Sequence, residues 1–282
     1  MSAVRSAENS HSIASAPLRM WVEAHEVRAF FILTFISSWS LWLLAWLSGE
    51  GPVRIALFLL GGFGPMMSAA AITHYTKGSI KEWARPIIRW RVSARFSLYA
   101  LGLPIALWTV INLELALLSE RFDLSLLPGR LAASVGTFLV VLTVGGAFEE
   151  PGWRGFALGR LQERYSPVRA TLLLGFVWGL WHTPVYGPLA FAFPMMLAFF
   201  YTYLYNTTGS LLMVILLHAS FTPASDNLAL VPRGVHGIND VVIFGTVLVA
   251  AVALVALTRG RLGYRNGPTT QADSSTEEGR SA

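Results

Sequence analysis

The chain has 282 residues, of which 54% are hydrophobic and only 13% are Asp, Glu, Lys or Arg. Soluble domains are about 25% charged, so this composition excludes most water-soluble folds of this length. Without cysteine the chain has no disulfide, thiolate nucleophile, cysteine-bound metal or prenylated C-terminus. The apolar residues occur in long blocks, such as 30–47 and 241–257, each about long enough to cross a bilayer core as a helix.

The two ends of the chain differ from this apolar body. Residues 1–28 are polar and contain no apolar core, so they are not a cleavable signal peptide, and we expect a cytoplasmic N-terminal segment. Residues 259–282 are rich in Gly, Ser and Thr and are expected to be a disordered cytoplasmic tail. Residues 29–258 form the predicted membrane domain.

In chain order, this domain contains eight predicted helical spans. Helices satisfy their backbone groups within lipid, and the sequence lacks the alternating pattern that is typical of membrane β-barrels. The predicted fold is therefore an all-α, polytopic transmembrane helical bundle. The spans lie at about 29–48, 55–76, 96–118, 131–149, 168–186, 189–205, 210–226 and 239–258.

Basic residues fall unequally on the two sides of these spans. The side that holds both termini carries 17 of the 21 Lys and Arg residues, and cytoplasmic loops carry such an excess, so both termini are expected to be cytoplasmic. The net charge of +5 is compatible with nucleic-acid binding, but these charges flank apolar blocks, so we expect the lipid bilayer and no nucleic acid as a partner. Arg outnumbers Lys 19 to 2, which indicates a GC-rich genome, and on this composition we expect a bacterial protein of the cytoplasmic membrane.

Two cytoplasmic segments, 80–96 and 153–165, interleave apolar with basic residues. This pattern is typical of amphipathic helices that lie in the membrane interface. Each is expected to rest on anionic headgroups, which contribute about 1 kcal/mol per basic residue near the surface.

The densest group of ionisable residues is the segment 149–155, which reads EEPGWRG. Adjacent carboxylates at the end of an apolar helix repel each other and lose hydration, so one favours its neutral form unless a cation compensates. Glu150 and Arg154 are four residues apart and are expected to pair on one helical face. Glu149 has no partner nearby in the sequence, which makes it a candidate general base. The alternative is a salt-bridged helix cap with Glu149 hydrated at the headgroups.

Two histidines, His182 and His218, stand inside apolar spans, and a proline follows each within five residues. Prolines at membrane depth free backbone carbonyls, which is tolerated best beside a cavity or a protein partner. Thr222 lies one turn after His218 and shares its face. A single histidine in such a span is more often structural than catalytic. Two histidines and a carboxylate pair on three helices are expected to form one polar site inside the membrane.

These motifs resemble the CPBP/Abi family of intramembrane glutamic proteases, which includes the type II CAAX prenyl endopeptidases. The resemblance rests on Glu-Glu-x-x-x-Arg at 149–154, an aromatic-x-x-x-His motif ending at His182, and a His-x-x-x motif beginning at His218. It covers about residues 130–228, the predicted protease-like core. Gly64-Pro65 in the second span is a weaker similarity.

The resemblance implies a role for each matching residue. Glu149 and His182 would activate a water molecule for attack on the scissile amide, and His218, with the residue four positions later, would stabilise the oxyanion. Glu150 and Arg154 match accessory positions.

Two residues depart from the pattern of the family. Trp178 stands where Phe is usual, and Thr222 stands where Asn is usual. A hydroxyl still donates one hydrogen bond, but it is shorter than an amide and aimed differently. Asn227 is an alternative donor after the kink at Pro223.

The expected function is therefore hydrolysis of a peptide bond in a membrane-associated peptide or protein substrate, in peptide processing or bacteriocin self-immunity. No cofactor is expected. Zinc stays an alternative, because Glu with two His is a common ligand set, although His-Glu-x-x-His is absent. The other alternative is a non-enzymatic protein, either a proton-coupled transporter or an immunity protein that sequesters a toxin.

Overall fold

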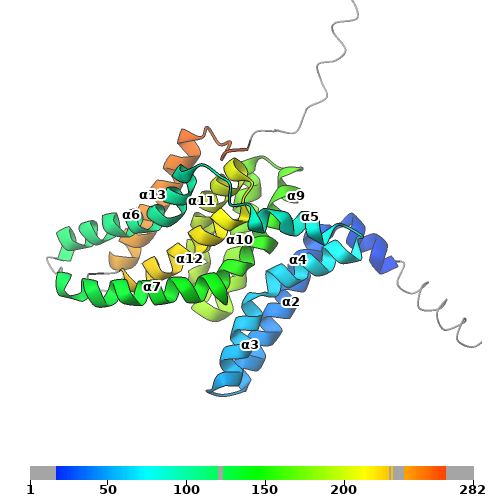
Figure 1. Cartoon of the computed structure of the whole chain (residues 1–282), viewed down its shortest axis with the longest axis horizontal. Helices are drawn as coiled ribbons and strands as arrows, with labels where there is room; N and C mark the ends of the chain where they lie inside the picture. Colours follow the sequence, from blue (N-terminus) through cyan, green and yellow to red (C-terminus); the bar gives the residue numbers. More distant parts are fainter. Residues whose placement is uncertain (1–16, 120–122, 229, 231–237, 265–282) are drawn as a thin grey trace, which may run out of the picture.

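The computed structural model describes residues 17–119, 123–228, 230 and 238–264 (Figure 1). The predicted N-terminal segment and tail therefore lie largely outside the described residues. Within the described ranges the chain is helical and has no β-strand, which confirms the predicted all-α polytopic bundle. The predicted spans correspond to α2 (Glu26–Leu47), α3 (Pro52–Gly62), α4 (Gly64–Tyr75), α6 (Ala94–Ser119), α7 (Leu127–Thr143), α10 (Pro167–Tyr186), α11 (Ala192–Thr208), α12 (Leu211–Asn227) and α13 (Ile238–Leu257).

Four helical stretches of the described chain are long and apolar enough to cross a membrane, and the bent pair α3 and α4 makes a fifth. The four stretches are 26–47, 94–118, 124–162 and 239–257. The chain is therefore an integral membrane protein. α10, α11 and α12 do not belong to this set, so the crossing of the membrane by these three helices, and the total of eight spans, remain predictions.

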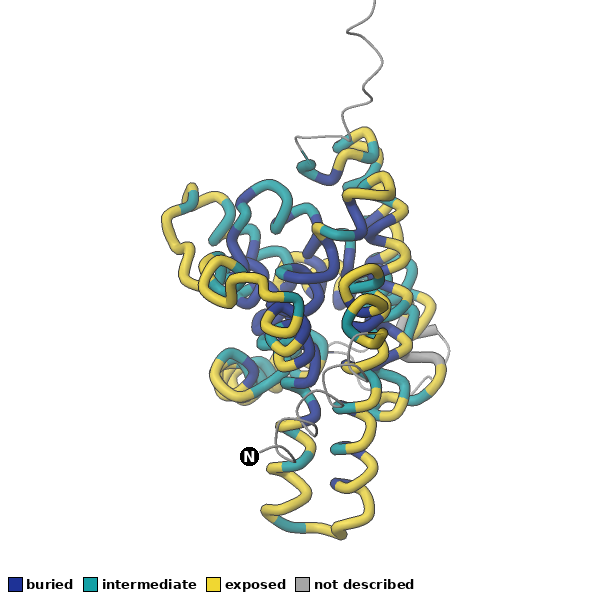
Figure 2. The backbone as a smooth tube through the Cα atoms, turned by 90° about the vertical axis from the view of Figure 1, so that its right-hand side faces the viewer, coloured by how far each residue is buried: buried dark blue, intermediate teal, exposed yellow. Residues whose placement is uncertain are grey.

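The second predicted span is bent by 50° at Phe63, where α3 ends and α4 begins. Pro65 lies in the first turn of α4, where its missing N–H costs no helical hydrogen bond. Gly64 packs so closely on the Ser38 hydroxyl that a Cβ at this position would overlap it. α2 and α3 then run side by side as an exposed hairpin below the rest of the molecule (Figure 2).

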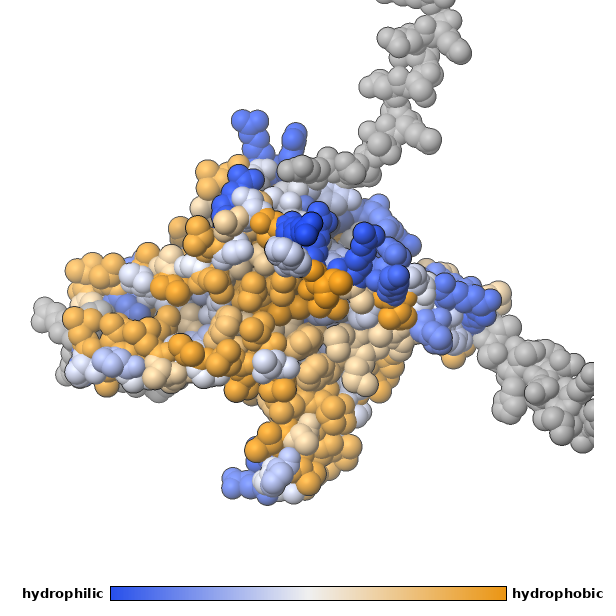
Figure 3. Space-filling model, in the orientation of Figure 1, coloured by the Kyte–Doolittle hydropathy of each residue, from blue (hydrophilic) through white to orange (hydrophobic). Residues whose placement is uncertain are grey.

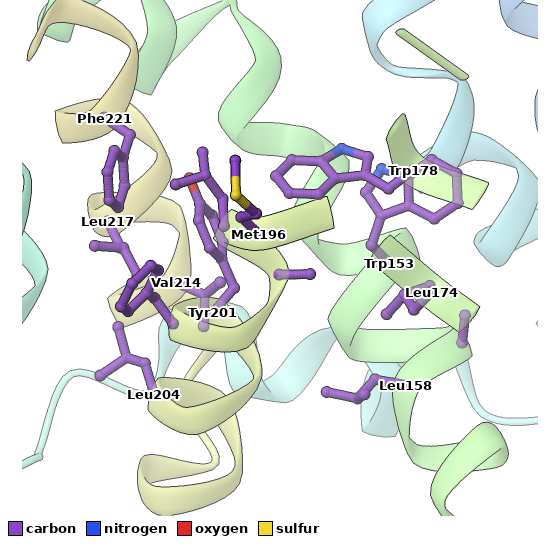
Figure 4. Close-up of a cluster of buried hydrophobic side chains, with 14 of the residues drawn as sticks. Trp153, Leu158, Leu174, Trp178, Met196, Tyr201, Leu204, Val214, Leu217 and Phe221 are labelled. Atoms are coloured by element: carbon purple, nitrogen blue, oxygen red, sulfur yellow. The ribbon is translucent and has the colours of Figure 1, made fainter. Parts of the chain in front are cut away.

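Large aromatic side chains fill the core between α10, α11 and α12. Trp178 of α10 and Tyr201 of α11 are almost completely buried, with ring centroids 5.4 Å apart. Trp153 packs against Trp181 of α10, with ring centroids 5.8 Å apart, and Phe221 of α12 faces Tyr201 (Figure 4). α10 approaches the start of α11 closely at Gly179, where a Cβ would overlap the carbonyl of Phe191. This packing brings together the helices that carry His182 and His218.

The two predicted interfacial helices differ from expectation. The first is divided into α5 (Ile80–Ala84), the 3-10 turn η1 (Arg85–Ile88) and an irregular stretch before α6, because Pro86 lacks the N–H that a continuous helix needs. The second, over 153–165, is not interfacial at its start. Its π-helical turn η4 (Trp153–Leu158) is buried apart from Gly155, since α4, α10 and α11 cover it.

The surface of the molecule is divided by polarity. A broad hydrophobic surface covers much of the face in Figure 3, and hydrophilic residues gather along its upper edge. The exposed basic side chains of the 77–95 loop and of the segment after α9 (Gly159–Gln162) belong to the hydrophilic part of the surface. A broad hydrophobic surface beside a hydrophilic edge that carries basic residues is expected of a protein embedded in a bilayer.

Candidate active site

The adjacent carboxylates lie at a break between helices. α7 ends at Thr143, and the 3-10 turn η3 (Gly146–Glu149) leads into the single turn α8 (Glu150–Gly152). Glu150 is the junction residue because Pro151 favours the first position of a new turn. Glu149 is 4% exposed and Glu150 is completely buried. The structure therefore contradicts the alternative in which Glu149 is hydrated at the headgroups.

Glu150 joins the first motif to α12. Its carboxylate accepts hydrogen bonds of 2.9 and 3.1 Å from Arg154 Nη1, which confirms the predicted pair. On its other side, Glu150 Oε1 lies 2.8 Å from His218 Nδ1. A carboxylate oxygen accepts, so Nδ1 is the donor and Nε2 stays available for other partners.

Arg154 is held between aromatic rings as well as by its carboxylate partner. Its guanidinium lies 4.3 Å from the ring centre of Trp178 and 4.6 Å from that of Tyr201. Such contacts stabilise a desolvated cation by about 2 kcal/mol or more. Arg154 is completely buried, so it supplies a positive charge to Glu150 without contact with solvent.

Glu149 is oriented by α10. The indole N–H of Trp178 donates to Glu149 Oε2 at 2.8 Å, and His182 Nε2 lies 3.9 Å from the same oxygen. His182 Nδ1 lies 2.8 Å from the backbone carbonyl of Trp178. A carbonyl accepts, so Nδ1 carries the hydrogen, and in the neutral ring Nε2 is an acceptor that faces Glu149. The 3.9 Å separation exceeds a direct hydrogen bond but is short enough for a bridging water molecule.

Gly146 has no side chain, and this leaves room for Glu149 and His218 to approach each other. A Cβ on this residue would stand 2.7 Å from Glu149 Oε1 and 3.3 Å from His218 Nε2. Both atoms therefore border the same small volume, on the side of Glu149 that does not contact Trp178. A methyl group at this position would displace one or both side chains.

These groups line a cavity of about 760 Å³. Glu149, His182 and His218 lie on its wall together, so the structure brings the three predicted catalytic residues into one site. The rest of the wall is mostly apolar and aromatic, and α6, α7 and α13 contribute to it. A largely apolar cavity with a few converging polar groups is the usual form of a binding site for a small or extended ligand.

The two candidate oxyanion donors on α12 are placed differently. Thr222 lines the cavity, and its hydroxyl donates to the carbonyl of His218 at 3.4 Å, a long and weak hydrogen bond. Asn227 is not part of the cavity wall. Its side-chain amide donates to the Thr137 hydroxyl and its backbone carbonyl accepts from Arg130, because the end of α12 packs against α7. The structure thus brings Thr222, and not Asn227, to the site.

Three residues of the site were not identified from the sequence. The role of Trp178 as a hydrogen-bond donor was missed, although its ring was noted as a departure from the family pattern. Gly146 precedes Glu149 by three residues but carries no side chain that signals chemistry. Tyr201, which lines the cavity 5.7 Å from the His218 ring, lies in an aromatic run that has no distinguishing pattern.

A structural or catalytic zinc ion needs at least three protein ligands that converge on one point. No group of three or more His, Asp or Glu side chains that could hold a metal ion is found within residues 17–119, 123–228, 230 and 238–264. Nδ1 of each site histidine already has a protein partner, which leaves Nε2 of each ring as its remaining ligand atom.

Comparison with known proteins supports the resemblance. Residues 131–222 match the family model described as Type II CAAX prenyl endopeptidase Rce1-like. This range contains Glu149, His182, His218 and Thr222 and ends before Asn227. The chain is also 26% identical over 169 residues to CAAX prenyl protease 2 of Methanococcus maripaludis, an alignment that covers 56% of this chain and 62% of that relative. The chain thus spans less than two thirds of the relative, and the resemblance to this protease family is confirmed.

Proposed function

We propose that this chain is an intramembrane endopeptidase that hydrolyses a peptide bond in a membrane-associated peptide or protein segment. The observation that carries the proposal is the convergence of Glu149, His182 and His218 on the wall of one largely apolar cavity. The match of residues 131–222 to a protease family supports it independently of the geometry.

In this mechanism, Glu149 and His182 together activate a water molecule. The water donates one hydrogen to a Glu149 oxygen and the other to His182 Nε2, since both are acceptors that face each other across 3.9 Å. Its lone pair then attacks the scissile carbonyl carbon, and Glu149 takes the proton. When the tetrahedral intermediate collapses, the carbon–nitrogen bond breaks and the leaving amine receives the proton from Glu149.

In this mechanism, His218 stabilises the oxyanion. Its Nδ1 hydrogen is held by Glu150, and the same carboxylate favours the imidazolium form, in which Nε2 also donates. The Thr222 hydroxyl is a second donor if it rotates away from the His218 carbonyl. Loss of one such donor in other enzymes lowers kcat by about 10²–10³-fold.

The substitution Glu149→Gln tests the mechanism. Purified protein in nanodiscs would be assayed with quenched fluorescent peptides that carry an apolar segment, with and without a prenyl group. The variant should lose nearly all turnover while it keeps its Tm and its peptide affinity, because glutamine accepts the Trp178 hydrogen bond but does not take a proton. Cleavage by the Glu149→Gln protein at the wild-type rate would overturn this mechanism.

A second candidate, a protein that sequesters a peptide without cleaving it, is favoured by the size and apolar lining of the cavity. Sequestration in a producer–immunity assay should survive Glu149→Gln, whereas protection by proteolysis should not. Loss of cleavage with a chelator and recovery with zinc would instead support the metal-dependent alternative.

The placement in a bacterial cytoplasmic membrane with both termini in the cytoplasm is part of the proposal. It rests on the unequal distribution of basic residues. Fusion of a reporter that is active only in the cytoplasm to either terminus should give signal in both cases. Signal from one terminus alone would show an odd number of spans.

A further inference from the structure

A basic segment, residues 79–96, lies on the outer side of η3, α8 and the start of α12, the elements that carry Glu149, Glu150 and His218. We infer that this segment binds the anionic phospholipid headgroups of the membrane, and that this binding holds the Glu149–Glu150 turn in place through Trp83. The inference goes beyond the proposed function, because it concerns the lipid partner of a surface that takes no part in the chemistry.

The outward side of the basic segment is both positive and apolar. It contains five basic residues and one acidic residue, Glu82, and all five basic side chains are exposed. Ile88 and Trp90 stand among them and are 74% and 66% exposed. Apolar side chains so exposed within a basic segment are typical of a surface that inserts into the headgroup region while its charges contact anionic lipid.

The inward side of the basic segment contacts the elements that carry the site. The Trp83 indole N–H donates to the carbonyl of Pro151 at 3.2 Å, directly after the two glutamates. Ile87 packs against a small buried cluster that includes Ala147 of η3 and Ile215 of α12. Headgroup binding on the outside would therefore stabilise residues on both sides of the two glutamates, Ala147 before them and Pro151 after them.

A third contact joins the basic segment to the helix of His218. The Ser210 hydroxyl donates to the carbonyl of Arg89 at 2.5 Å, and it also accepts from the Met213 N–H as the cap of α12. The basic segment is thus fixed to the beginning of α12 and to the turn that follows Glu150. It connects the two elements whose side chains, Glu150 and His218, meet at 2.8 Å.

Lipid is favoured over a nucleic acid or an acidic protein because of where the segment lies. Hydrophilic side chains along this edge of the molecule border a broad hydrophobic surface (Figure 3), as they do at a membrane interface. Arg91 lies over the Trp90 ring and Arg95 over the Phe96 ring, so cations and aromatic rings share one surface. Aromatic rings beside Lys and Arg are enriched at the headgroup level of bilayers.

The test uses full-length protein in nanodiscs of phosphatidylcholine alone or of phosphatidylcholine with phosphatidylglycerol. The chain has no cysteine, so a spin label on Ile88→Cys is unique, and its immersion depth reports contact with lipid. Hydrogen–deuterium exchange over residues 145–155 reports how firmly the catalytic turn is held. We expect the label to lie deeper, and the exchange to be several-fold slower, in the phosphatidylglycerol nanodiscs.

Two sets of three substitutions distinguish lipid binding by the basic segment from an effect of the total charge of the protein. Arg85→Gln, Arg91→Gln and Arg95→Gln together should abolish both differences, since each lost charge weakens binding to an anionic surface about fivefold. The matched control, Arg164→Gln, Arg169→Gln and Arg261→Gln, removes three exposed arginines elsewhere and should keep both differences. Trp83→Phe should keep the depth change but lose the slower exchange, because it removes only the hydrogen bond to Pro151.

Equal label depth and equal exchange in the two lipids would overturn the inference. The same shifts produced in pure phosphatidylcholine by inorganic phosphate or by RNA would also overturn it, because lipid would not be the partner. Neither measurement depends on peptide cleavage. A protein that cleaves no peptide but keeps both lipid effects would therefore refute the proposed function and leave this inference supported.

Discussion

Trp178 donates its indole N–H to the carboxylate of Glu149 across 2.8 Å, although 29 residues separate the two in the sequence. The backbone carbonyl of Trp178 also holds His182 Nδ1, so one residue orients the carboxylate and the imidazole that face each other. Phenylalanine, which the resemblance places at this position in the family, has the ring but lacks the donor. The tryptophan of this chain therefore adds a hydrogen bond that the family pattern does not contain.

The substitution Trp178→Phe tests that hydrogen bond. It keeps a six-membered aromatic ring beside Arg154 but removes the five-membered ring of the indole together with its N–H. Hydrogen bonds to charged groups contribute about 1.5–3 kcal/mol, so kcat should fall about 10- to 100-fold while KM changes little. The measurement is steady-state cleavage of a quenched peptide in nanodiscs.

Trp181→Phe is the matched control for this variant. Trp181 is buried on the same helix and lines the same cavity, but its indole N–H has no hydrogen-bond partner among the described residues. This variant should keep kcat close to the wild-type value, because it removes part of an indole ring but no hydrogen bond to the site. Equal losses in the two variants would show that indole volume, and not the donor, is what matters.

Gly146→Ala should inactivate the protein through sterics alone. The added methyl carbon would stand 2.7 Å from Glu149 Oε1, well inside van der Waals contact, and 3.3 Å from His218 Nε2. Displacement of a catalytic group by about 1 Å costs about 100-fold in rate. Peptide cleavage should fall by this order, and peptide affinity should change less.

Gly136→Ala is the control for the glycine substitution. Gly136 lies on α7, and a Cβ there would meet nothing within 4 Å, so the activity should be unchanged and the helix slightly more stable. If Gly146→Ala also cleaved peptide normally, the close approach of Glu149 and His218 would not be required for turnover.

Thr222→Asn should raise turnover. Thr222 lines the cavity but donates only a long hydrogen bond to the His218 carbonyl, and an amide at this position reaches further and has two hydrogens to donate. An added oxyanion donor should increase kcat up to about tenfold, less than the loss seen when an established donor is removed. Thr222→Val, which is similar in shape but has no donor, should lower kcat. A lower kcat for the asparagine variant would show that this residue does not face the oxyanion.

The sequence predicted those features of the fold and site that depend on local spacing. All eight predicted segments are helical, and Glu150 pairs with Arg154 because four residues make one helical turn. Features that depend on contacts between distant helices were not predictable. Examples are the hydrogen bond from Trp178 to Glu149 and the contact of Asn227 with Thr137, which is 90 residues away in the sequence.

The predicted exposure of Arg154 was also wrong, because the surrounding pattern is typical of an amphipathic helix. Residues 153–165 alternate apolar with charged residues, which predicted an interfacial helix. In the structure the charge of Arg154 faces inward, since Glu150, Trp178 and Tyr201 surround it. A charged residue that is compensated by distant partners cannot be distinguished in the sequence from one that is hydrated.

The buried pair of Glu150 and Arg154 should dominate the stability of the site. Arg154→Met leaves Glu150 buried without its arginine partner, and removing one member of such a pair typically costs about 3–5 kcal/mol. The double variant Glu150→Gln and Arg154→Met should recover part of this loss, because no uncompensated carboxylate remains. The free energy of unfolding would be measured by denaturant titration in mixed micelles.

Arg160→Met provides the comparison for this stability effect. Arg160 pairs with Glu26 at 2.6 Å, but the two side chains remain 32% and 27% exposed. Partly hydrated pairs contribute about 0–1 kcal/mol, so this variant should unfold with nearly the wild-type free energy. If Arg154→Met were no more costly than Arg160→Met, the pair of Glu150 and Arg154 would not be a main source of stability at the site.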